Sequence, residues 1–323
     1  MSEEQKFDLP HEKQIQEYSK TIEHLRKQVD GNPLFKGEVS RLEKKLEALK
    51  KKVYSELTPW DRVLISRHPK RPHTKDYIQA ITTDFFELHG DRTFGDDRAI
   101  IGGLAQIDDL PVMIVGQEKG SNTDERVERN FGMVSPEGFR KVMRLMELAA
   151  RMGLPVVSLL DTPGAYPGLE AEQRGQGWVI AENLQKMFSI QTPIIVLVIG
   201  EGCSGGALGM GVGDVIGMLE HAYYSVISPE GCASILLKDA TKKQEVANIL
   251  KLTAEDLLKL NIIDEIIQEP LGGAHNNPET IYARVKEFIL GKAHSLSHIP
   301  AEVLLEQRYA KFRTMGIVST KKR

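Results

Sequence analysis

The sequence has very little cysteine, no close cysteine pair and no excess of positive charge. Cys203 and Cys232 are its only cysteines, and no Cys-X-X-Cys motif occurs, which argues against a disulfide framework and a structural zinc site. The net charge of -3 provides no basic surface for nucleic acid. We therefore expect a protein of a reducing compartment that binds no metal ion and requires no nucleic acid.

Long hydrophobic runs are also missing. The apolar segments are far too short to span a bilayer, and residues 1–6 lack the apolar core of a signal peptide. We therefore expect a cytoplasmic protein without a membrane partner. With 41% hydrophobic and 27% charged residues, the composition is that of a globular protein large enough for one or two domains.

The N-terminal region, residues 1–55, has the spacing of two amphipathic helices. Apolar side chains recur at steps of three and four residues on both sides of a break at Asp30–Pro33; they are Ile15, Tyr18, Ile22, Leu25 and Val29, then Val39, Leu42, Leu46, Leu49 and Val53. Two such stripes around a turn predict an antiparallel helical hairpin. Its charged surface indicates a role in packing or oligomer contact rather than in chemistry.

From about residue 75 the pattern changes to alternating strands and helices. A hairpin is predicted over 99–115, and a helix begins at Ser135-Pro136 and ends at Gly153. Further predicted elements are strands at 155–160, 193–199, 215–219, 223–227 and 262–267, and helices at 170–188 and 254–260. This order predicts the α/β class.

Two of these strands are each followed by a glycine-rich turn. The first turn is Asp161–Gly168 and the second is Gly200–Ala207, where residues from 205 onward resemble the start of a helix. Glycines between a strand and a helix leave backbone N–H groups approachable, and such groups can hold a developing oxyanion. The two turns therefore suggest chemistry performed by the backbone.

The second turn satisfies three patterns, and spacing alone leaves all three open. Gly200, Gly202 and Gly205 form a G-x-G-x-x-G dinucleotide fingerprint, with Glu220 as the acidic residue. Residues 202–206 also form a G-x-S-x-G motif, in which Ser204 would need a partner such as His221 or His275. The third interpretation, which we favour, is an oxyanion hole formed by the N–H groups of Gly205 and Gly206.

Seven segments in a fixed order carry a family resemblance. They are Arg129–Met133, Pro136–Lys141, Asp161–Gly168, Glu172–Gln176, Gly200–Ala207, Tyr224–Gly231 and Glu269–His275. On these segments the chain resembles the alpha subunits of acetyl-CoA carboxylase carboxyltransferase, within the crotonase-like carboxyltransferase family. The implied fold is a crotonase-like superhelix of stacked β-β-α units over residues 56–294, flanked by the helical arm and by a C-terminal helix and basic tail over 295–323.

The resemblance also implies an activity and a set of partners. The family transfers the carboxyl group of carboxybiotin, carried on a separate protein, to acetyl-CoA, which gives malonyl-CoA in the first committed step of fatty acid synthesis. The implied partners are a zinc-ribbon beta subunit in an assembly of two alpha and two beta subunits, the biotin carboxyl carrier protein and biotin carboxylase. Biotin is the implied cofactor.

The resemblance assigns roles to particular residues. Gly205 and Gly206 are expected to donate to the biotin ureido oxygen, so that a side chain at 206 would fill the space of the ring. The opposite wall would be Gly164 and Ala165, with Tyr166 against biotin. Positive charge near the coenzyme A phosphates or the partner subunit would come from Lys119, Arg126, Arg129 and Arg140.

The sequence departs from the family pattern at two places, and rival functions remain. Cys203 stands where glycine is usual, and Gln173 and Gly177-Trp178 alter the loop after the first turn. One alternative is a stand-alone acyl-CoA hydratase or isomerase, which would need a pocket carboxylate such as Glu170 or Glu172. The other is a non-catalytic scaffold subunit.

Overall fold

The computed structural model describes residues 9–29 and 36–316, and a mixed β-sheet lies at its centre. The strands follow the order β1-β2-β3-β4-β5-β6-β8, and β7 pairs with the far end of β5. Their bounds are β1 Thr83–Glu87, β2 Ile100–Ile107, β3 Leu110–Gln117, β4 Val156–Thr162, β5 Ile194–Cys203, β6 Val215–Leu219, β7 Tyr223–Ser225 and β8 Glu265–Ile267. The predicted α/β class is confirmed.

The pairing within the sheet changes at β3. The predicted hairpin is formed by β2 and β3, which pair antiparallel from Ile100 opposite Gln117 to Ile107 opposite Leu110. From β3 onward, β4, β5, β6 and β8 are parallel neighbours. Parallel strands place their carboxyl ends at one edge, so the segments that follow β4 and β5 meet there.

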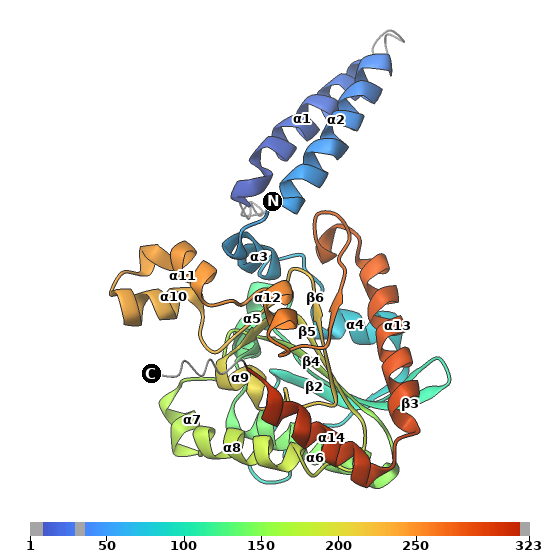
Figure 1. Ribbon diagram of the computed structural model, residues 1–323, viewed down its shortest axis with the longest axis vertical. Coiled ribbons are helices and arrows are strands. Elements are labelled where there is room, and N and C mark those ends of the chain that lie inside the picture. The colour runs from blue at the N-terminus through green and yellow to red at the C-terminus, as the bar shows by residue number, and fades with distance from the viewer. Residues whose placement is uncertain (1–8, 30–35, 317–323) are drawn as a thin grey trace, which may run out of the picture.

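Helices cover both faces of the sheet (Figure 1). They are α1 Lys13–Val29, α2 Lys36–Ser55, α3 Pro59–Ser66, α4 Thr74–Ile81, α5 Thr123–Glu128, α6 Pro136–Met152, α7 Leu169–Gln173, α8 Gln176–Met187, α9 Ser204–Leu208, α10 Pro229–Cys232, α11 Lys243–Ile249, α12 Ala254–Lys259, α13 Pro278–Ser297 and α14 Ala301–Thr314. Short 3₁₀ segments span Pro10–Glu12, Asn130–Gly132, Ala240–Lys242 and Ala274–Asn276, and a π turn spans Ala233–Leu237. The polar helix predicted over 170–188 is two helices, because Gly175 adopts φ 81° between them.

The bounds of helix α6 follow from residues at its two ends. Pro136 occupies its first turn, and Gly153 ends it in the left-handed conformation at φ 68°. The face with Phe139, Val142 and Met146 is buried against the sheet. Burial of this apolar stripe stabilises the helix far more than helix propensity alone could.

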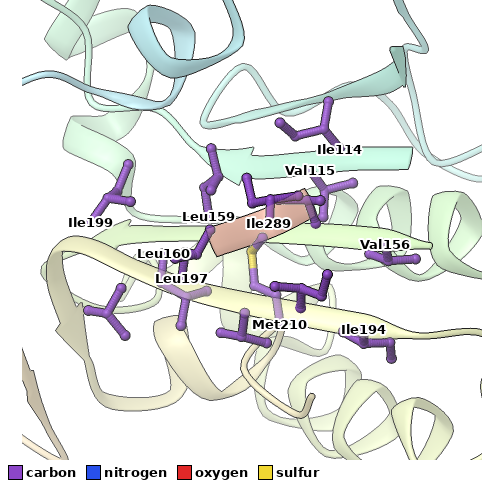
Figure 2. Close-up of a cluster of buried hydrophobic side chains, with 14 of the residues drawn as sticks. Ile114, Val115, Val156, Leu159, Leu160, Ile194, Leu197, Ile199, Met210 and Ile289 are labelled. Carbon is purple, nitrogen blue, oxygen red and sulfur yellow. The ribbon is translucent and has the colours of Figure 1, made fainter. Parts of the chain in front are cut away.

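The core lies between these helices and the parallel strands. Every residue of β4 and β5 is buried, as expected for strands covered on both faces. Figure 2 shows Leu159 of β4, Leu197 of β5 and Ile289 of α13 in one apolar cluster. Such packing leaves the ends of the strands, rather than their middles, available for polar groups.

The N-terminal arm is an antiparallel hairpin of α1 and α2 that projects away from the body (Figure 1). Ile15 and Ile22 of α1 and Val39 of α2 are buried, which confirms the predicted hairpin. The break predicted at 30–33 lies outside the described residues, as does the basic tail after residue 316. At its base, the Tyr54 hydroxyl donates to Glu12 Oε1 at 2.5 Å.

The C-terminal helix α14 is fixed to the body by Arg308. This side chain is 1% exposed and binds both carboxylate oxygens of Asp214, at 2.8 and 2.7 Å. It also donates to the carbonyl oxygens of Met187, Ile190 and Thr192. The predicted division of the chain at residues 55 and 294 stays a prediction. Helix α13 runs through residue 294, and Leu304 of α14 belongs to the same core as β5.

Within the described ranges, none of the helices has the length and apolarity needed to cross a membrane.

We expect Arg308→Ala to lower the free energy of unfolding by about 3–5 kcal/mol, because it leaves the buried Asp214 carboxylate without its cation. Urea unfolding followed by circular dichroism measures this difference. The matched control is Arg313→Ala, on the exposed side of the same helix, which should change stability by less than about 0.5 kcal/mol. Equal stability of the two variants would show that Arg308 does not anchor α14.

Candidate active site

The two glycine turns lie directly against each other at the carboxyl ends of β4 and β5. A β-carbon on Gly206 would fall 2.4 Å from the carbonyl carbon of Gly164 and 2.6 Å from the nitrogen of Ala165. Only glycine permits so close an approach of two backbones. The structure therefore brings together Gly205, Gly206, Gly164 and Ala165, as the resemblance implied, but the β-carbon position at 206 points into the first turn rather than into open space.

Gln117, at the end of β3, joins the two turns. This buried side chain donates from Nε2 to the carbonyl oxygen of Gly206 at 2.6 Å, and its Oε1 accepts the N–H of Asp161 at 3.0 Å. The amide thus uses both of its ends and fixes the spacing between the turns.

Gly205 and Gly206 lie in the first turn of α9, where backbone N–H groups have no intrahelical acceptor. The residue that precedes the helix, Cys203, supplies no side-chain cap. A β-carbon on Gly164, whose φ is 150°, would meet no atom within 4 Å. The first turn of α9 therefore has N–H groups that Cys203 does not cap, and the neighbouring first turn has open space at Gly164; an oxyanion hole needs free N–H donors of this kind.

The dinucleotide alternative is not supported by this geometry. Strand β5 continues through Gly200 and Gly202 to Cys203, so these glycines form part of a strand and not a phosphate-binding turn. The turn begins only at Ser204 and is shorter than predicted, because β7 pairs with residues 201–203 and extends β5.

The serine hydrolase alternative has a suitable turn but lacks a base. Ser204 has φ 57° between a strand and a helix, as in a nucleophile elbow. However, His221 Nδ1 lies 3.2 Å from Arg62 Nη1, and His275 stacks on His68 with ring centroids 3.7 Å apart. Among the described residues, no hydrogen bond joins Ser204 to either histidine, so the structure does not form a triad.

Of the side chains that follow the first turn, Tyr166 is half-buried, whereas Glu170 and Glu172 are exposed. The half-buried ring of Tyr166 packs over Gly168, where a β-carbon would lie 2.5 Å from the ring. Glu170 and Glu172, the carboxylates required by the hydratase alternative, are exposed on α7. The structure does not bring those two carboxylates into a pocket.

Lys119 lies in a buried cluster of charges and not on the surface. Its Nζ is 2.7 Å from Asp161 Oδ1 and 2.7 Å from Glu201 Oε1. Burial opposes ionisation of both carboxyl groups, but the neighbouring cations outweigh it. The Lys119 ammonium and the His73 imidazole hold the pKa of Asp161 well below its usual range, and Lys119 and Arg67 lower the pKa of Glu201.

Arg67 extends this cluster toward the surface. Its Nε lies 2.6 Å from Glu201 Oε2 and its Nη1 lies 2.6 Å from Glu230 Oε1. The Tyr223 hydroxyl donates to Glu201 Oε2 at 2.8 Å. Asp161 and Glu201 are thus satisfied by several partners each, as buried charges must be.

A pocket of about 280 Å³ opens beside this cluster and beside the first glycine turn. Its charged walls are Arg67, Lys119, Arg126 and Glu201, and the remaining walls are Ser66, His68, His73, Phe131 and Pro163. Pro163 belongs to the first turn and directly precedes Gly164. The pocket therefore reaches the first glycine turn at Pro163.

The other predicted basic residues have different surroundings. Arg129 donates from Nη1 to the carbonyl oxygen of Arg98 at 2.6 Å, and Arg140 Nε binds Asp91 Oδ2 at 2.7 Å. Of the four basic residues predicted, Lys119 and Arg126 line the pocket.

Sequence reasoning missed Arg67, His73, Asp161 and Glu201 as site residues. A signal was present for two of them, because Asp161 and Glu201 are charged residues within otherwise apolar segments, next to the glycine turns. Arg67 and His73 come from a segment more than 80 residues away from Asp161, and local spacing cannot reveal such a contact. In the part of the chain that the structure describes, no three His, Cys, Asp or Glu side chains are grouped so as to hold a metal ion.

Comparison with known proteins gives consistent results. A family model described as acetyl co-enzyme A carboxylase carboxyltransferase-like matches residues 8–316. The alpha subunit of acetyl-coenzyme A carboxylase carboxyl transferase from Protochlamydia amoebophila is 64% identical over 95% of this chain and 98% of that protein. The corresponding subunit from Chlamydia trachomatis serovar L2 is 56% identical over 97% of each chain.

Solved structures agree in fold at low sequence identity. A transcarboxylase 12S structure superposes with a TM-score of 0.56 at 17% identity, over 80% of this chain and 46% of that one. A Pseudomonas malonate decarboxylase hetero-tetramer superposes with a TM-score of 0.55 at 16% identity, over 68% of this chain and 90% of that one. The neighbours are crotonase-fold carboxyltransferases, so the predicted fold is confirmed. With the family model matching nearly its whole length, the chain belongs to the acetyl co-enzyme A carboxylase carboxyltransferase-like family.

Proposed function

We infer that this chain is the alpha-type half of a carboxyltransferase, which transfers the carboxyl group of carboxybiotin to acetyl-CoA and so forms malonyl-CoA. The observation that carries this proposal is the contact between the two glycine turns, which brings the first turn of α9, uncapped by Cys203, against Gly164 and Ala165. The identity to alpha subunits over almost the whole chain supports the same conclusion.

The residues of the chain act mainly through their backbone in this proposal. Carboxybiotin, when bound, would supply the carboxyl group and a ureido oxygen on which negative charge can develop. The N–H groups of Gly205 and Gly206 donate to this oxygen, and each fixed donor of this kind lowers a barrier by about 3 kcal/mol in comparable sites. Gly164 and Ala165 form the opposite wall, and Tyr166 borders it.

The buried ion pairs at the ends of β4 and β5 hold the two glycine turns in place. Lys119 holds Asp161 and Glu201 at the strand ends, so it contributes fixed positive charge rather than a mobile phosphate ligand. Arg129 lies two residues before Phe131, which lines the pocket, and stays a proposed contact for coenzyme A or the partner subunit.

The proposal includes partners and a compartment. A beta subunit of the zinc-ribbon type would hold the acetyl thioester, in an assembly of two alpha and two beta subunits. The carrier protein would bring biotin from biotin carboxylase, and all would act in the cytoplasm. The naming of the relatives as alpha subunits supports the need for a second type of subunit.

We expect the purified chain alone to form no malonyl-CoA from acetyl-CoA and carboxybiotin, and to do so when a beta-type subunit is added, because the thioester site is proposed to lie on that subunit. Product formation is followed by chromatography. Assay of the chain alone with an enoyl-CoA serves as the control for the hydratase alternative. Turnover of either substrate by the isolated chain would contradict the proposal.

We expect Ser204→Ala to keep the rate of carboxyl transfer within about tenfold of the original, because the site uses N–H groups and not the hydroxyl as a nucleophile. The rate is measured in the complete two-subunit enzyme, together with the melting temperature. A loss of more than a thousandfold at unchanged melting temperature, with labelling of the original protein by a serine-reactive probe, would support the hydrolase alternative.

We expect Gly206→Ala to lower both stability and turnover, because its β-carbon would collide with the backbone at Gly164 and push the two turns apart. Overpacking of this kind costs about 1–3 kcal/mol. Gly177→Ala, in α8, is the control, because a β-carbon there meets no atom within 4 Å and should be neutral or stabilising. Unchanged melting and normal turnover of the Gly206 variant would show that the enzyme does not need the close contact between the two turns.

A further inference from the structure

The side chain of Gln117, at the end of β3, is fully buried and binds the backbone on both sides of the glycine-turn contact. Its Nε2 donates to the carbonyl oxygen of Gly206 at 2.6 Å, and its Oε1 accepts the N–H of Asp161 at 3.0 Å. A backbone carbonyl can only accept and a backbone N–H can only donate, so the amide fits these two partners in one orientation.

The carbonyl of Gly206 lacks its usual partner within a helix. Helix α9 ends at Leu208, and the N–H of Met210, which would bind this carbonyl in a longer helix, donates to Ala207 instead at 3.3 Å. A buried carbonyl needs a donor, and Gln117 provides it. The direction of the peptide group that follows Gly206 therefore depends on a side chain from another strand.

Gln117 is itself held by the sheet and by α4. It pairs with Ile100 in the antiparallel ladder of β2 and β3, and its carbonyl oxygen accepts the Thr74 hydroxyl at 2.5 Å. At the preceding position, a β-carbon on Gly116 would lie 2.6 Å from Thr74 Cγ2 and 2.9 Å from Leu159 Cβ. The end of β3 is thus packed tightly on two sides, so the amide cannot shift without moving the sheet.

The charge cluster beside Gln117 acts at a different level. Lys119 Nζ lies 2.7 Å from Asp161 Oδ1, and the backbone N–H of Glu201 donates to the same oxygen at 3.0 Å. These contacts join the strand ends from which both turns start, but neither of them is made to α9. The amide of Gln117 makes that bond, at Gly206.

We propose that Gln117 is a positioning residue for carboxyl transfer, whose amide holds the first turn of α9 in the direction that its backbone N–H donors need. The inference rests on the proposed function and deepens it, because it assigns the geometry of the proposed oxyanion hole to one side chain. Gln117 acts through the backbone and not by contact with substrate. A displacement of about 1 Å in such a site can cost about a hundredfold in rate.

The sharpest variant is Gln117→Glu, which keeps the shape of the side chain. A protonated carboxyl group can donate to the Gly206 carbonyl and accept the Asp161 N–H, whereas an ionised one can only accept. Burial, and a carbonyl that can only accept, raise the pKa of the introduced carboxyl above its usual range. The variant should therefore work when this group is protonated and fail when it is ionised.

The rate is measured in the complete two-subunit enzyme, in the reverse reaction from malonyl-CoA and free biotin, over about pH 5 to 9. Relative to the original enzyme, kcat should stay within about tenfold at low pH and fall about tenfold for each pH unit above the pKa of the introduced group. KM for malonyl-CoA should not change, because the thioester site is proposed to lie on the partner subunit. A kcat ratio that does not fall with rising pH would overturn the proposal.

The stability of the same variant gives a readout that does not depend on turnover. The pKa of the introduced carboxyl is higher in the folded chain than in the unfolded chain, where it is about 4.3. Its stability relative to the original chain should therefore fall as pH rises above that value, and should level off at the folded pKa, where the loss of kcat begins. Urea unfolding of the full chain at a series of pH values measures this. A stability difference independent of pH would overturn the proposal.

A second variant, Gln117→Met, has a side chain of similar length that cannot replace the amide at either end. Its kcat should be about a hundredfold lower at every pH, at temperatures where the melting curve shows the enzyme to be folded. A folded Gln117→Met enzyme with kcat within about threefold of the original would overturn the proposal.

The matched control is Asn183→Asp, the same change from amide to acid at another buried position. Asn183 is 1% exposed, and its Nδ2 donates to the carbonyl oxygens of Phe139 and Gly209 at 2.9 and 3.0 Å, but it binds neither Asp161 nor Gly206. Its stability should also fall with rising pH, while its kcat stays within about threefold of the original. Equal losses of kcat in both acid variants would overturn the specific role of Gln117.

The original enzyme separates the two levels of the argument. If it does not turn over malonyl-CoA and biotin, the proposed function fails. Normal turnover of the original enzyme, together with a level kcat ratio for Gln117→Glu, rejects this inference alone.

Discussion

The buried carboxylate of Asp161 is the interaction on which the site depends. It accepts from the Lys119 ammonium, from His73 Nδ1 and from the backbone N–H of Glu201 at 3.0 Å. These donors come from three separate parts of the chain, so the carboxylate holds together the ends of β3, β4 and β5 and the loop before α4. A buried charge is stable only when such partners are all present, which makes this arrangement an all-or-none assembly.

The close contact of the glycine turns follows from that assembly. Asp161 lies in β4, two residues before Pro163 of the first turn, and Glu201 lies in β5, three residues before Ser204, so fixing the two carboxylates around Lys119 also fixes the distance between the turns. Gln117 then bridges Asp161 and Gly206 directly. A site built from backbone N–H groups needs this rigidity, because its donors cannot adjust their direction as side chains can.

The helical arm is connected to the site through one short segment. At its base, Leu9, Ile15 and Tyr54 pack against Ile65 of α3. The same helix leads into the segment with Arg67, Arg71 and His73, which supplies the pocket.

The sequence by itself determined the class, the family and most of the local structure. The heptad spacing of the arm, the Ser-Pro start and glycine end of α6, and the glycine turns after apolar strands are local signals, because periodicity, caps and turns depend on neighbouring residues. The family resemblance also pointed to Gly164, Ala165, Gly205 and Gly206, which the structure brings to one edge of the sheet.

Only the tertiary structure decided which charges face the site and which are neutralised. The sequence suggested that Lys119 is a free cation for phosphates, but in the structure it is paired with two carboxylates. The sequence also suggested that Gly200 and Gly202 belong to a phosphate-binding turn, but pairing with β7 makes this segment part of strand β5. His73 is 88 residues from its partner Asp161. Contacts of this range arise when the whole sheet closes, and no local pattern encodes them, because they depend on which strands become neighbours and on where their ends meet.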